Sequence, residues 1–384
     1  MDTQRTGVYL DHAATSWPKP ACVVEAVADA LTVYGGNPGR GAYSLALETA
    51  RAIERARNDV ATLLGVRDSS HISFQPGATQ ALNLVLNGLV SPGDRVVVSG
   101  GEHNAVRRPL NRLAQSGVDV VVVPTDERGY ADVDRIEEAV AEAPTALVVC
   151  QHASNLTGAI HPIADLADIS HAHGARIVVD GAQAGGHLDV SLEVLGVDAW
   201  ACSGHKGLLG PVGVGVLYLS DSCDPTELVA GGGVGPAGEP NQPVDHPGRY
   251  EAGTPNTLGI LGLGAAARYL LLEGDAIRSR EAELVDRMHR GVLDVGGLSV
   301  LGPDVGEPRV PLVSIIGAST LPEVMAADIA RLGGIASRAG MHCTPWSHQS
   351  LGTESTGALR LSVGWSTKRA DVDSALAALR LALS

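Results

Sequence analysis

The chain has 384 residues, of which 45% are hydrophobic and 18% charged, and its formal net charge is −15. This length accommodates one large and one smaller domain, and the composition is typical of a globular enzyme with a sizeable core. The acidic balance excludes general nucleic-acid binding. No apolar run reaches the roughly 18 residues of a membrane span, and the N-terminus has no apolar signal core. We therefore expect a cytoplasmic protein with no nucleic-acid or membrane partner.

The five cysteines are scattered and include no Cys-x-x-Cys pair, so neither a disulfide framework nor a metal site is expected. Cys150 and Cys202 lie in or beside apolar strands, and Cys22 begins a helix. Cys223 lies in a Ser-Asp-Ser-Cys-Asp turn, a pattern that predicts an exposed thiol. The fifth, Cys343, lies near the C-terminus.

The first elements are an arm and two helices. Residues 8–20 predict a short strand and a loop broken by two prolines, so residues 1–20 are taken as an N-terminal arm. Amphipathic helices are predicted over residues 21–34 and 45–64. Between them lies a glycine-rich loop that contains Gly39 and Arg40, and its role is left open.

Residues 72–85 predict a strand, a turn and a helix, with Gly77, Ala78 and Thr79 at the helix N-terminus. Free backbone N–H groups and the helix dipole make such an end suitable for a phosphate group. Thr79 is also a plausible N-cap, and the two roles are compatible.

Three later strands deliver polar side chains. The strands that begin near residues 94 and 146 are followed by His103 and Asn155, and the strand that begins near residue 175 ends in Asp180. Open α/β sheets bind ligands at the carboxyl ends of their strands. We therefore expect these side chains to share one site.

Lys206 is one of only three lysines, against 25 arginines, and it lies on a glycine-rich loop followed by an apolar, strand-like run. A primary amine in such a place suits a Schiff base with an aldehyde cofactor. The alternative is a surface lysine in a glycine turn. Asp180 favours the cofactor, because a carboxylate there pairs with the ring nitrogen of pyridoxal 5'-phosphate (PLP).

The motifs Val179-Asp-Gly-Ala-Gln183 and Ser203-Gly-His-Lys206 resemble the class V aminotransferase family, and within it the cysteine desulfurases. The resemblance extends over nearly the whole chain. It implies an α/β fold, PLP-dependent transferase fold type I, with a mostly parallel seven-stranded-type sheet and a small α+β C-terminal domain. We place the large PLP-binding domain at residues 21–264 and the small domain at 265–384. Helices are predicted at 258–273 and 276–293 around that boundary.

The resemblance also implies a role for each matched residue. Lys206 would hold the cofactor aldehyde, Asp180 the ring nitrogen and His103 the face of the ring. The phenolic oxygen and the phosphate would be bound by Asn155, Gln183, Ala78, Thr79, Ser203, His205 and, from a neighbouring subunit, Thr254. The last contact implies a homodimer.

The second informative stretch is Arg338-Ala-Gly-Met-His-Cys343, in a loop bounded by glycine and proline. A cysteine in such a loop is expected to be exposed, and His342 and His348 beside it would favour its thiolate. A metal site built from these three groups lacks a sound ligand set. The stretch resembles the short-loop type of cysteine desulfurase, in which this pattern carries the sulfur-accepting cysteine.

The implied reaction converts L-cysteine to L-alanine and leaves the sulfur on Cys343 as a persulfide, for transfer to a protein acceptor. Lys206 and His103 would move protons. Arg360, on an apolar strand, would bind the substrate carboxylate together with Arg338 and Asn155; a surface arginine is the alternative. Three other functions stay open: a selenocysteine lyase acting on L-selenocysteine, a PLP-dependent lyase that does not use Cys343, and a non-catalytic PLP-binding partner protein.

Overall fold

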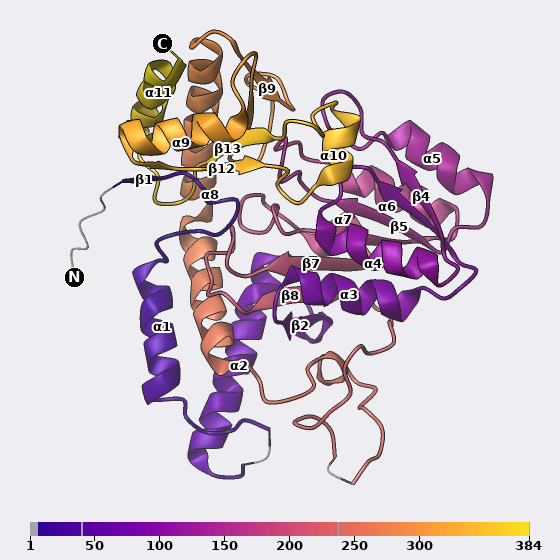
Figure 1. Cartoon of the computed structure of the whole chain (residues 1–384). Helices are drawn as coiled ribbons and strands as arrows, with labels where there is room; N and C mark the ends of the chain where they lie inside the picture. The colour runs from indigo at the N-terminus through magenta and orange to yellow at the C-terminus, as the bar shows by residue number, and fades with distance from the viewer. Residues whose placement is uncertain (1–6, 40, 237, 384) are drawn as a thin grey trace.

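The computed structural model describes residues 7–39, 41–236 and 238–383 (Figure 1). Arg40, in the predicted glycine-rich loop, lies outside the described residues. No helix among the described residues has the length and apolarity to cross a bilayer.

A seven-stranded sheet forms the centre of the larger part of the molecule, in the order β2-β8-β7-β6-β5-β3-β4. Strand β8 runs antiparallel to both of its neighbours, and the other four pairs are parallel. The predicted mostly parallel sheet is confirmed. The inner parallel strands β3, β5 and β6 are almost entirely buried, as parallel strands are when helices cover a sheet on both faces, whereas the edge strand β4 is partly exposed. The strands are β2 (Ile72–Gln75), β3 (Arg95–Ser99), β4 (Asp119–Val123), β5 (Leu147–Gln151), β6 (Arg176–Asp180), β7 (Ala199–Ser203) and β8 (Gly215–Leu219).

Helices pack on both faces of this sheet. Alternate residues of β3 point to opposite faces: Val96 and Val98 pack with α3 and α4, whereas Val97 packs on the side of α5 and α6. Figure 1 shows α1, α2 and the lower half of α8 beside one another at one end of the sheet. The helices of this part are α1 (Ala21–Thr32), α2 (Ser44–Leu63), α3 (Ala78–Leu89), α4 (Asn104–Gln115), α5 (Val133–Glu142), α6 (Ile163–Ala172), α7 (Leu192–Leu195) and α8 (Thr257–Leu293), with short 3-10 turns η1 (Ser69–His71) and η2 (Gly248–Tyr250).

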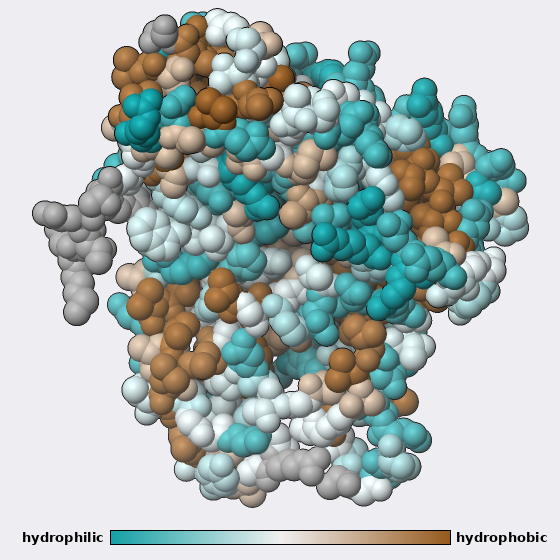
Figure 2. Space-filling model, in the orientation of Figure 1, coloured by the Kyte–Doolittle hydropathy of each residue, from teal (hydrophilic) through white to brown (hydrophobic). Residues whose placement is uncertain are grey.

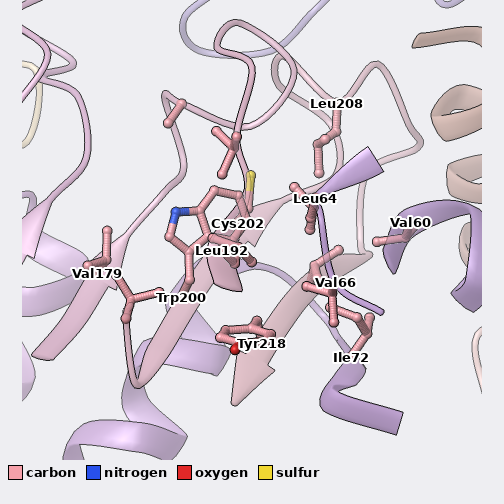
Figure 3. Close-up of a cluster of buried hydrophobic side chains, with 14 of the residues drawn as sticks. Val60, Leu64, Val66, Ile72, Val179, Leu192, Trp200, Cys202, Leu208 and Tyr218 are labelled. Atoms are coloured by element: carbon pink, nitrogen blue, oxygen red, sulfur yellow. The ribbon is translucent and has the colours of Figure 1, made fainter. Parts of the chain in front are cut away.

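Trp200 lies at the centre of the larger core, between side chains of the neighbouring strands (Figure 3). It is fully buried, and a Cβ atom on Gly181 would come within 1.9 Å of its ring. Glycine is therefore required directly after Asp180, because the chain leaves β6 across the face of this indole. The packing fixes the start of the loop that begins at Asp180.

Helix α8 is one continuous helix of 37 residues, so the prediction of two helices over 258–273 and 276–293 is wrong. Gly274 stays helical, and the guanidinium of Arg278 fills the space beside it, 2.9 Å from where a Cβ would lie. The helix packs into the larger core as far as Ile277 and into the smaller core from Leu284. The predicted boundary at residue 265 falls within this helix, and the domain division stays a prediction.

The smaller part is built on a four-stranded antiparallel sheet in the order β12-β13-β10-β9. This arrangement of helices on one antiparallel sheet confirms the α+β architecture. Strand β1 at the start of the N-terminal arm pairs in parallel with β11, so the arm is tied to this part. The elements are β1 (Val8–Tyr9), β9 (Leu298–Leu301), β10 (Leu312–Gly317), β11 (Ile335–Ala336), β12 (Arg338–Gly340), β13 (Ala358–Ser362), α9 (Pro322–Gly333), α10 (Pro345–Ser350) and α11 (Arg369–Leu383).

Candidate active site

Polar side chains meet at the carboxyl ends of β5, β6 and β7. The register places Gln151 opposite Asp180 and Asp180 opposite Ala201, so β5 and β6 end together and β7 extends two residues further to Ser203. A cavity opens at this edge of the sheet, as expected for an open α/β sheet. It is lined by Ala78, Thr79, His103, Ala105, Gln151, Ala153, Asn155, Asp180, Ala182, Gln183, Ser203 and Lys206.

The N-terminus of α3 faces one end of the cavity. The backbone N–H of Ala78 donates to Ser203 Oγ at 3.1 Å. Gly77 occupies the N-cap position, so the interpretation of Thr79 as the N-cap is wrong. The hydroxyl of Thr79 is therefore not used for capping, and it lines the cavity beside the free end of the helix. This end of the cavity has the donors that a phosphate group needs.

His205, next to Lys206, is partly buried and does not line the cavity. Burial, with the charges of Lys206 and Lys19, lowers the pKa of His205 to about 4. The imidazole is neutral at physiological pH.

His103 has a structural role as well as a place in the cavity. It is the N-cap of α4, and its Nδ1 accepts a hydrogen bond from the N–H of Ala105 at 3.0 Å. Burial, with smaller effects of Lys206 and Arg338, lowers the pKa of His103 to about 4. The imidazole is therefore neutral, and its single proton lies on Nε2.

Asp180 and Lys206 influence each other's charge. Asp180 is 5% exposed, and its Oδ1 accepts a hydrogen bond from the N–H of Ala182 at 2.9 Å. Burial raises the pKa of Asp180, and the nearby Lys206 ammonium opposes that rise. Burial likewise lowers the pKa of Lys206, and Asp180 opposes that change. A second cation beside Asp180 would favour its ionised form further.

The side-chain amides of Asn155 and Gln183 each donate one hydrogen bond to a backbone carbonyl. Asn155 Nδ2 donates to the carbonyl of His342 at 2.8 Å, and Gln183 Nε2 donates to the carbonyl of Ala13 at 2.9 Å. An amide nitrogen carries two N–H groups, so each has one more to offer to a group in the cavity.

The loop of Cys343 is fastened beside this cavity. His342 and Cys343 both adopt positive φ angles, 47° and 62°, which residues with a Cβ rarely adopt. Their carbonyls accept hydrogen bonds from Asn155 Nδ2 at 2.8 Å and from the N–H of Asn104 at 2.8 Å. The thiol is partly buried, and Arg338 Nη2 donates to its Sγ at 3.7 Å.

The expectation that His342 and His348 favour a thiolate at Cys343 is wrong. His342 is 3% exposed and donates through Nε2 to the carbonyl of Ala358, and burial lowers its pKa to about 3. His348 is fully buried against Thr353, and burial lowers its pKa too. Both rings are neutral and bring no positive charge to the sulfur. The cation at the thiol is Arg338.

Arg360 is 1% exposed, which rules out a surface arginine. Its Nη1 donates to the carbonyl of Asn155 at 2.8 Å, and its Nη2 donates to Asp11 Oδ1 at 3.1 Å. Strand pairing places it directly opposite Arg338. The site therefore presents two guanidinium groups between Asn155 and the loop of Cys343.

Two buried residues of the site were missed from the sequence. Gln151 lines the cavity, and Glu102 Oε1 accepts a hydrogen bond from its backbone N–H at 2.6 Å. Burial, together with the charge of Asp180, raises the pKa of Glu102 well above its usual range and so favours the neutral form of this carboxyl. Their positions at or just after the ends of predicted strands were the available signal.

Thr254 is exposed and does not line the cavity within the single chain.

Cys223 is fully buried, so the prediction that its thiol is exposed is wrong. Burial, with the charge of Asp198, raises the pKa of Cys223 to about 12. Cys150 and Cys202 are buried, as the sequence indicates.

Acidification is expected to destabilise the fold through its buried histidines. Burial lowers the pKa values of His103, His152, His161, His205 and His342 to between about 3 and about 4. Below about pH 6.5 the histidines of the unfolded chain are protonated, whereas the buried histidines of the folded chain stay neutral. The free energy of unfolding therefore falls as the pH decreases from about 6.5 to about 4. Urea unfolding at a series of pH values from neutral to mildly acidic measures the slope.

Substitution of the buried His161 and of the exposed His173 gives a matched pair of variants for that measurement. The Nδ1 of His161 accepts from the N–H of Ala131, and an asparagine oxygen can replace that acceptor. His161→Asn should reduce the slope, whereas His173→Asn, at an exposed position, should not. A free energy of unfolding that stays constant over this range would contradict the assignment of neutral buried imidazoles.

Comparison with known proteins agrees with this geometry. A family model described as "Aminotransferase class-V" matches residues 8–375. A probable cysteine desulfurase of Methanothermobacter thermautotrophicus is 37% identical over 359 residues, which cover 92% of this chain and 88% of the relative. A cysteine desulfurase of an Enterobacter species is 34% identical over 351 residues, covering 87% of this chain and 84% of the relative.

Solved structures give the same result. The apo structure of a cysteine desulfurase from Thermococcus onnurineus has a TM-score of 0.91 at 32% identity, and the match covers 98% of this chain and 94% of that one. A cysteine desulfurase from Escherichia coli has a TM-score of 0.87 at 32% identity, with the same coverage. Together these matches confirm the resemblance that the sequence motifs indicate: the chain belongs to the class V aminotransferase family.

Proposed function

We propose that this protein is a PLP-dependent cysteine desulfurase that converts L-cysteine to L-alanine and leaves the sulfur as a persulfide on Cys343. The observation that carries the proposal is the place of this thiol. Its sulfur accepts a hydrogen bond from Arg338, and its loop is bound by Asn155, which also lines the cavity that contains Lys206. The names of the relatives support the same chemistry.

The residues of the cavity fit PLP. The α3 N-terminus, Thr79 and Ser203 offer donors to the phosphate, and His103 offers a flat, neutral ring. Asp180 offers a carboxylate to the ring nitrogen, and Lys206 offers an amine for covalent attachment. The spare N–H groups of the two amides suit the phenolic oxygen. When bound, PLP supplies the electron sink that stabilises negative charge at the substrate Cα.

The reaction then depends on what this chain's own residues do. Arg360, with Arg338 opposite, binds the substrate carboxylate and orients the Cα–H bond. Lys206 Nζ takes the Cα proton and later returns a proton, since burial favours its neutral form. Cys343 Sγ attacks the substrate sulfur, so that an S–S bond forms as the C–S bond breaks, and alanine leaves.

One assay separates this function from its rivals. Alanine is measured from L-cysteine with and without a thiol reductant, and selenide is measured from L-selenocysteine. Alanine that forms together with a bound persulfide supports the desulfurase. Alanine without any persulfide would indicate a lyase that does not use Cys343, and no product from either substrate would indicate a non-catalytic PLP-binding protein.

Asp180→Asn is expected to lower alanine formation by about 100-fold or more while the fold persists. An amide cannot supply the negative charge that keeps the ring nitrogen protonated. The Ala182 N–H can still be bound by the amide oxygen, which preserves the local turn. Steady-state kinetics and thermal unfolding of the variant test this. Activity within a few-fold of the parent would remove Asp180 from the role.

The proposal includes a homodimer and a separate protein that accepts the sulfur. One of the groups of exposed apolar side chains, brown at the lower left of Figure 2, lies where α1 and α2 lie in Figure 1. They include Val24, Leu31, Leu45 and Leu47. The exposed Thr254 would reach the phosphate of the second subunit from its loop. Apolar surface of this kind is typical of a protein interface.

Light scattering under assay conditions is expected to give twice the mass of the chain. Thr254→Ala is expected to weaken PLP binding, because it removes a hydroxyl contributed by the second subunit. Thr257→Ala, at the start of α8, is a control for loss of a nearby hydroxyl. A monomer with full activity would contradict the shared site.

A further inference from the structure

The carbonyl of His205 belongs to the peptide bond that leads into Lys206. The turn around this lysine closes on itself, since the N–H of Gly210 donates to Gly204 O at 2.7 Å and the N–H of Leu209 donates to Lys206 O at 2.9 Å. The carbonyl of His205 takes no part in these two bonds. Its hydrogen-bond donors come instead from the N-terminal arm, nearly 190 residues away in the sequence.

Four donors of the arm meet at this one oxygen. They are the N–H of Ser16 at 2.9 Å, Ser16 Oγ at 3.0 Å, Lys19 Nζ at 2.8 Å and Thr15 Oγ1 at 3.3 Å. Lys19 Nζ also donates to Ser16 Oγ at 2.7 Å. A carbonyl oxygen has two lone pairs, and the ammonium makes the charge-assisted, stronger bond among these.

Lys19 is a cation among neutral partners. Its side chain is partly buried, and both of its hydrogen bonds go to uncharged oxygens. Burial lowers its pKa to about 8. Desolvation of an ammonium without a carboxylate partner costs free energy. The folded state therefore bears the desolvation cost of the Lys19 ammonium, which lies beside the peptide bond between His205 and Lys206.

The N-terminal arm is also held by contacts that do not involve His205. Strand β1 pairs with β11, and Trp365 Nε1 donates to the carbonyl of Pro18 at 2.8 Å. Tyr9 Oη donates to the carbonyl of Thr15 at 2.9 Å, which closes the arm into a compact loop. Lys19 thus reaches the turn of Lys206 from a segment anchored by β11 and Trp365.

We propose that Lys19 is a positioning residue that locks the main chain at Lys206 and so aims the Lys206 amine at the reacting atoms. This rests on the proposed role of Lys206 in catalysis. A misplacement of about 1 Å far from the chemistry can lower a rate by about 100-fold. Because Arg360 still binds the substrate carboxylate, loss of the lock should lower kcat and leave KM nearly unchanged.

The test compares Lys19→Met with Lys368→Met, a matched substitution at the third, exposed lysine. Backbone hydrogen exchange of residues 204–210 is measured in the PLP-loaded protein and in the cofactor-free chain, alongside kcat and KM for alanine formation. In Lys19→Met we expect exchange in this segment to rise about tenfold and kcat to fall about 10- to 100-fold, with KM within about twofold. Lys368→Met should match the parent, and Lys19→Arg should restore most of both quantities.

The proposal would be overturned if Lys19→Met had the same hydrogen-exchange rates in residues 204–210 and the same kcat as the parent protein. It would also be overturned by a loss of kcat with unchanged exchange in residues 204–210. If the parent forms no alanine from cysteine, the proposed function fails, and the exchange measurement still decides on the lock. Should Lys19→Met not fold, Ser16→Ala removes one donor hydroxyl and the partner of Lys19. It is expected to raise exchange in the same segment by a smaller factor, and unchanged exchange would overturn the lock.

Discussion

Lys206→Ala is expected to abolish the formation of alanine from L-cysteine. Among the residues that the structure describes, Lys206 is the only lysine that lines the cavity, so its loss removes both the covalent attachment of the cofactor and the group that moves the Cα proton. Loss of a positioned proton-transfer group alone lowers a rate by roughly 10²–10⁴-fold. The purified parent protein should be yellow from bound PLP and should retain the cofactor covalently after borohydride reduction.

The variant should lose that covalent attachment, measured by mass spectrometry of the peptide that contains residue 206. Lys368→Ala is the matched control, because Lys368 is exposed and lies outside the cavity. It should retain colour, covalent attachment and turnover. Normal turnover by Lys206→Ala would remove the centre of the proposed function.

Cys343→Ser is expected to retain PLP and the binding of L-cysteine but to lose sulfur transfer by orders of magnitude. Lys206, Asp180 and Arg360 are untouched, so the cofactor and the substrate carboxylate keep their partners. A serine hydroxyl stays protonated and cannot accept sulfur as a thiolate does. Spectral titration with L-cysteine measures binding, and alanine and sulfide assays measure transfer.

The other cysteines are not expected to replace it. Cys150, Cys202 and Cys223 are buried, and burial raises the pKa of each. Cys22 is the other partly exposed thiol among the described residues, so Cys22→Ser is the matched control and should retain full activity. Full activity in Cys343→Ser would leave the PLP site standing and remove the desulfurase function.

The sequence predicted the fold and the carboxyl-end site well, because strong local patterns determine both. Valine-rich runs specify buried parallel strands, and the polar residue that follows each run must then lie at one edge of the sheet. His103, Asn155 and Asp180 were placed in this way, and Lys206 was placed by its glycine-rich loop; all four line one cavity. Only the roles of these side chains stay predictions.

The errors arose where tertiary contacts override a local signal. Two helices were predicted with a break at residues 274–275, but α8 packs on both cores and continues through this point. The polar turn around Cys223 indicates exposure, yet the thiol packs into the core beside Tyr250. His342 precedes the cysteine and His348 follows it by five residues, but the fold buries both rings and leaves them neutral.

The N-terminal arm shows what a single sequence cannot reveal. Its contacts join Asp11 to Arg360, which are 349 positions apart, and Lys19 to the carbonyl of His205, which are 186 positions apart. No periodicity or motif links such distant positions. The arm is held in place by the pairing of β1 with β11 and by the bond from Trp365 to Pro18, and neither contact has a signal in the local sequence.

Peptide mass spectrometry after a single turnover with L-cysteine, without reductant, tests the central claim most directly. The account predicts that the peptide containing Cys343 gains the mass of one sulfur atom, in a ratio of about one to the alanine released, since one thiolate accepts one sulfur. The peptides containing Cys22 and Cys223 should stay unmodified. Alanine release with the added sulfur on another cysteine, or on none, would contradict the claim.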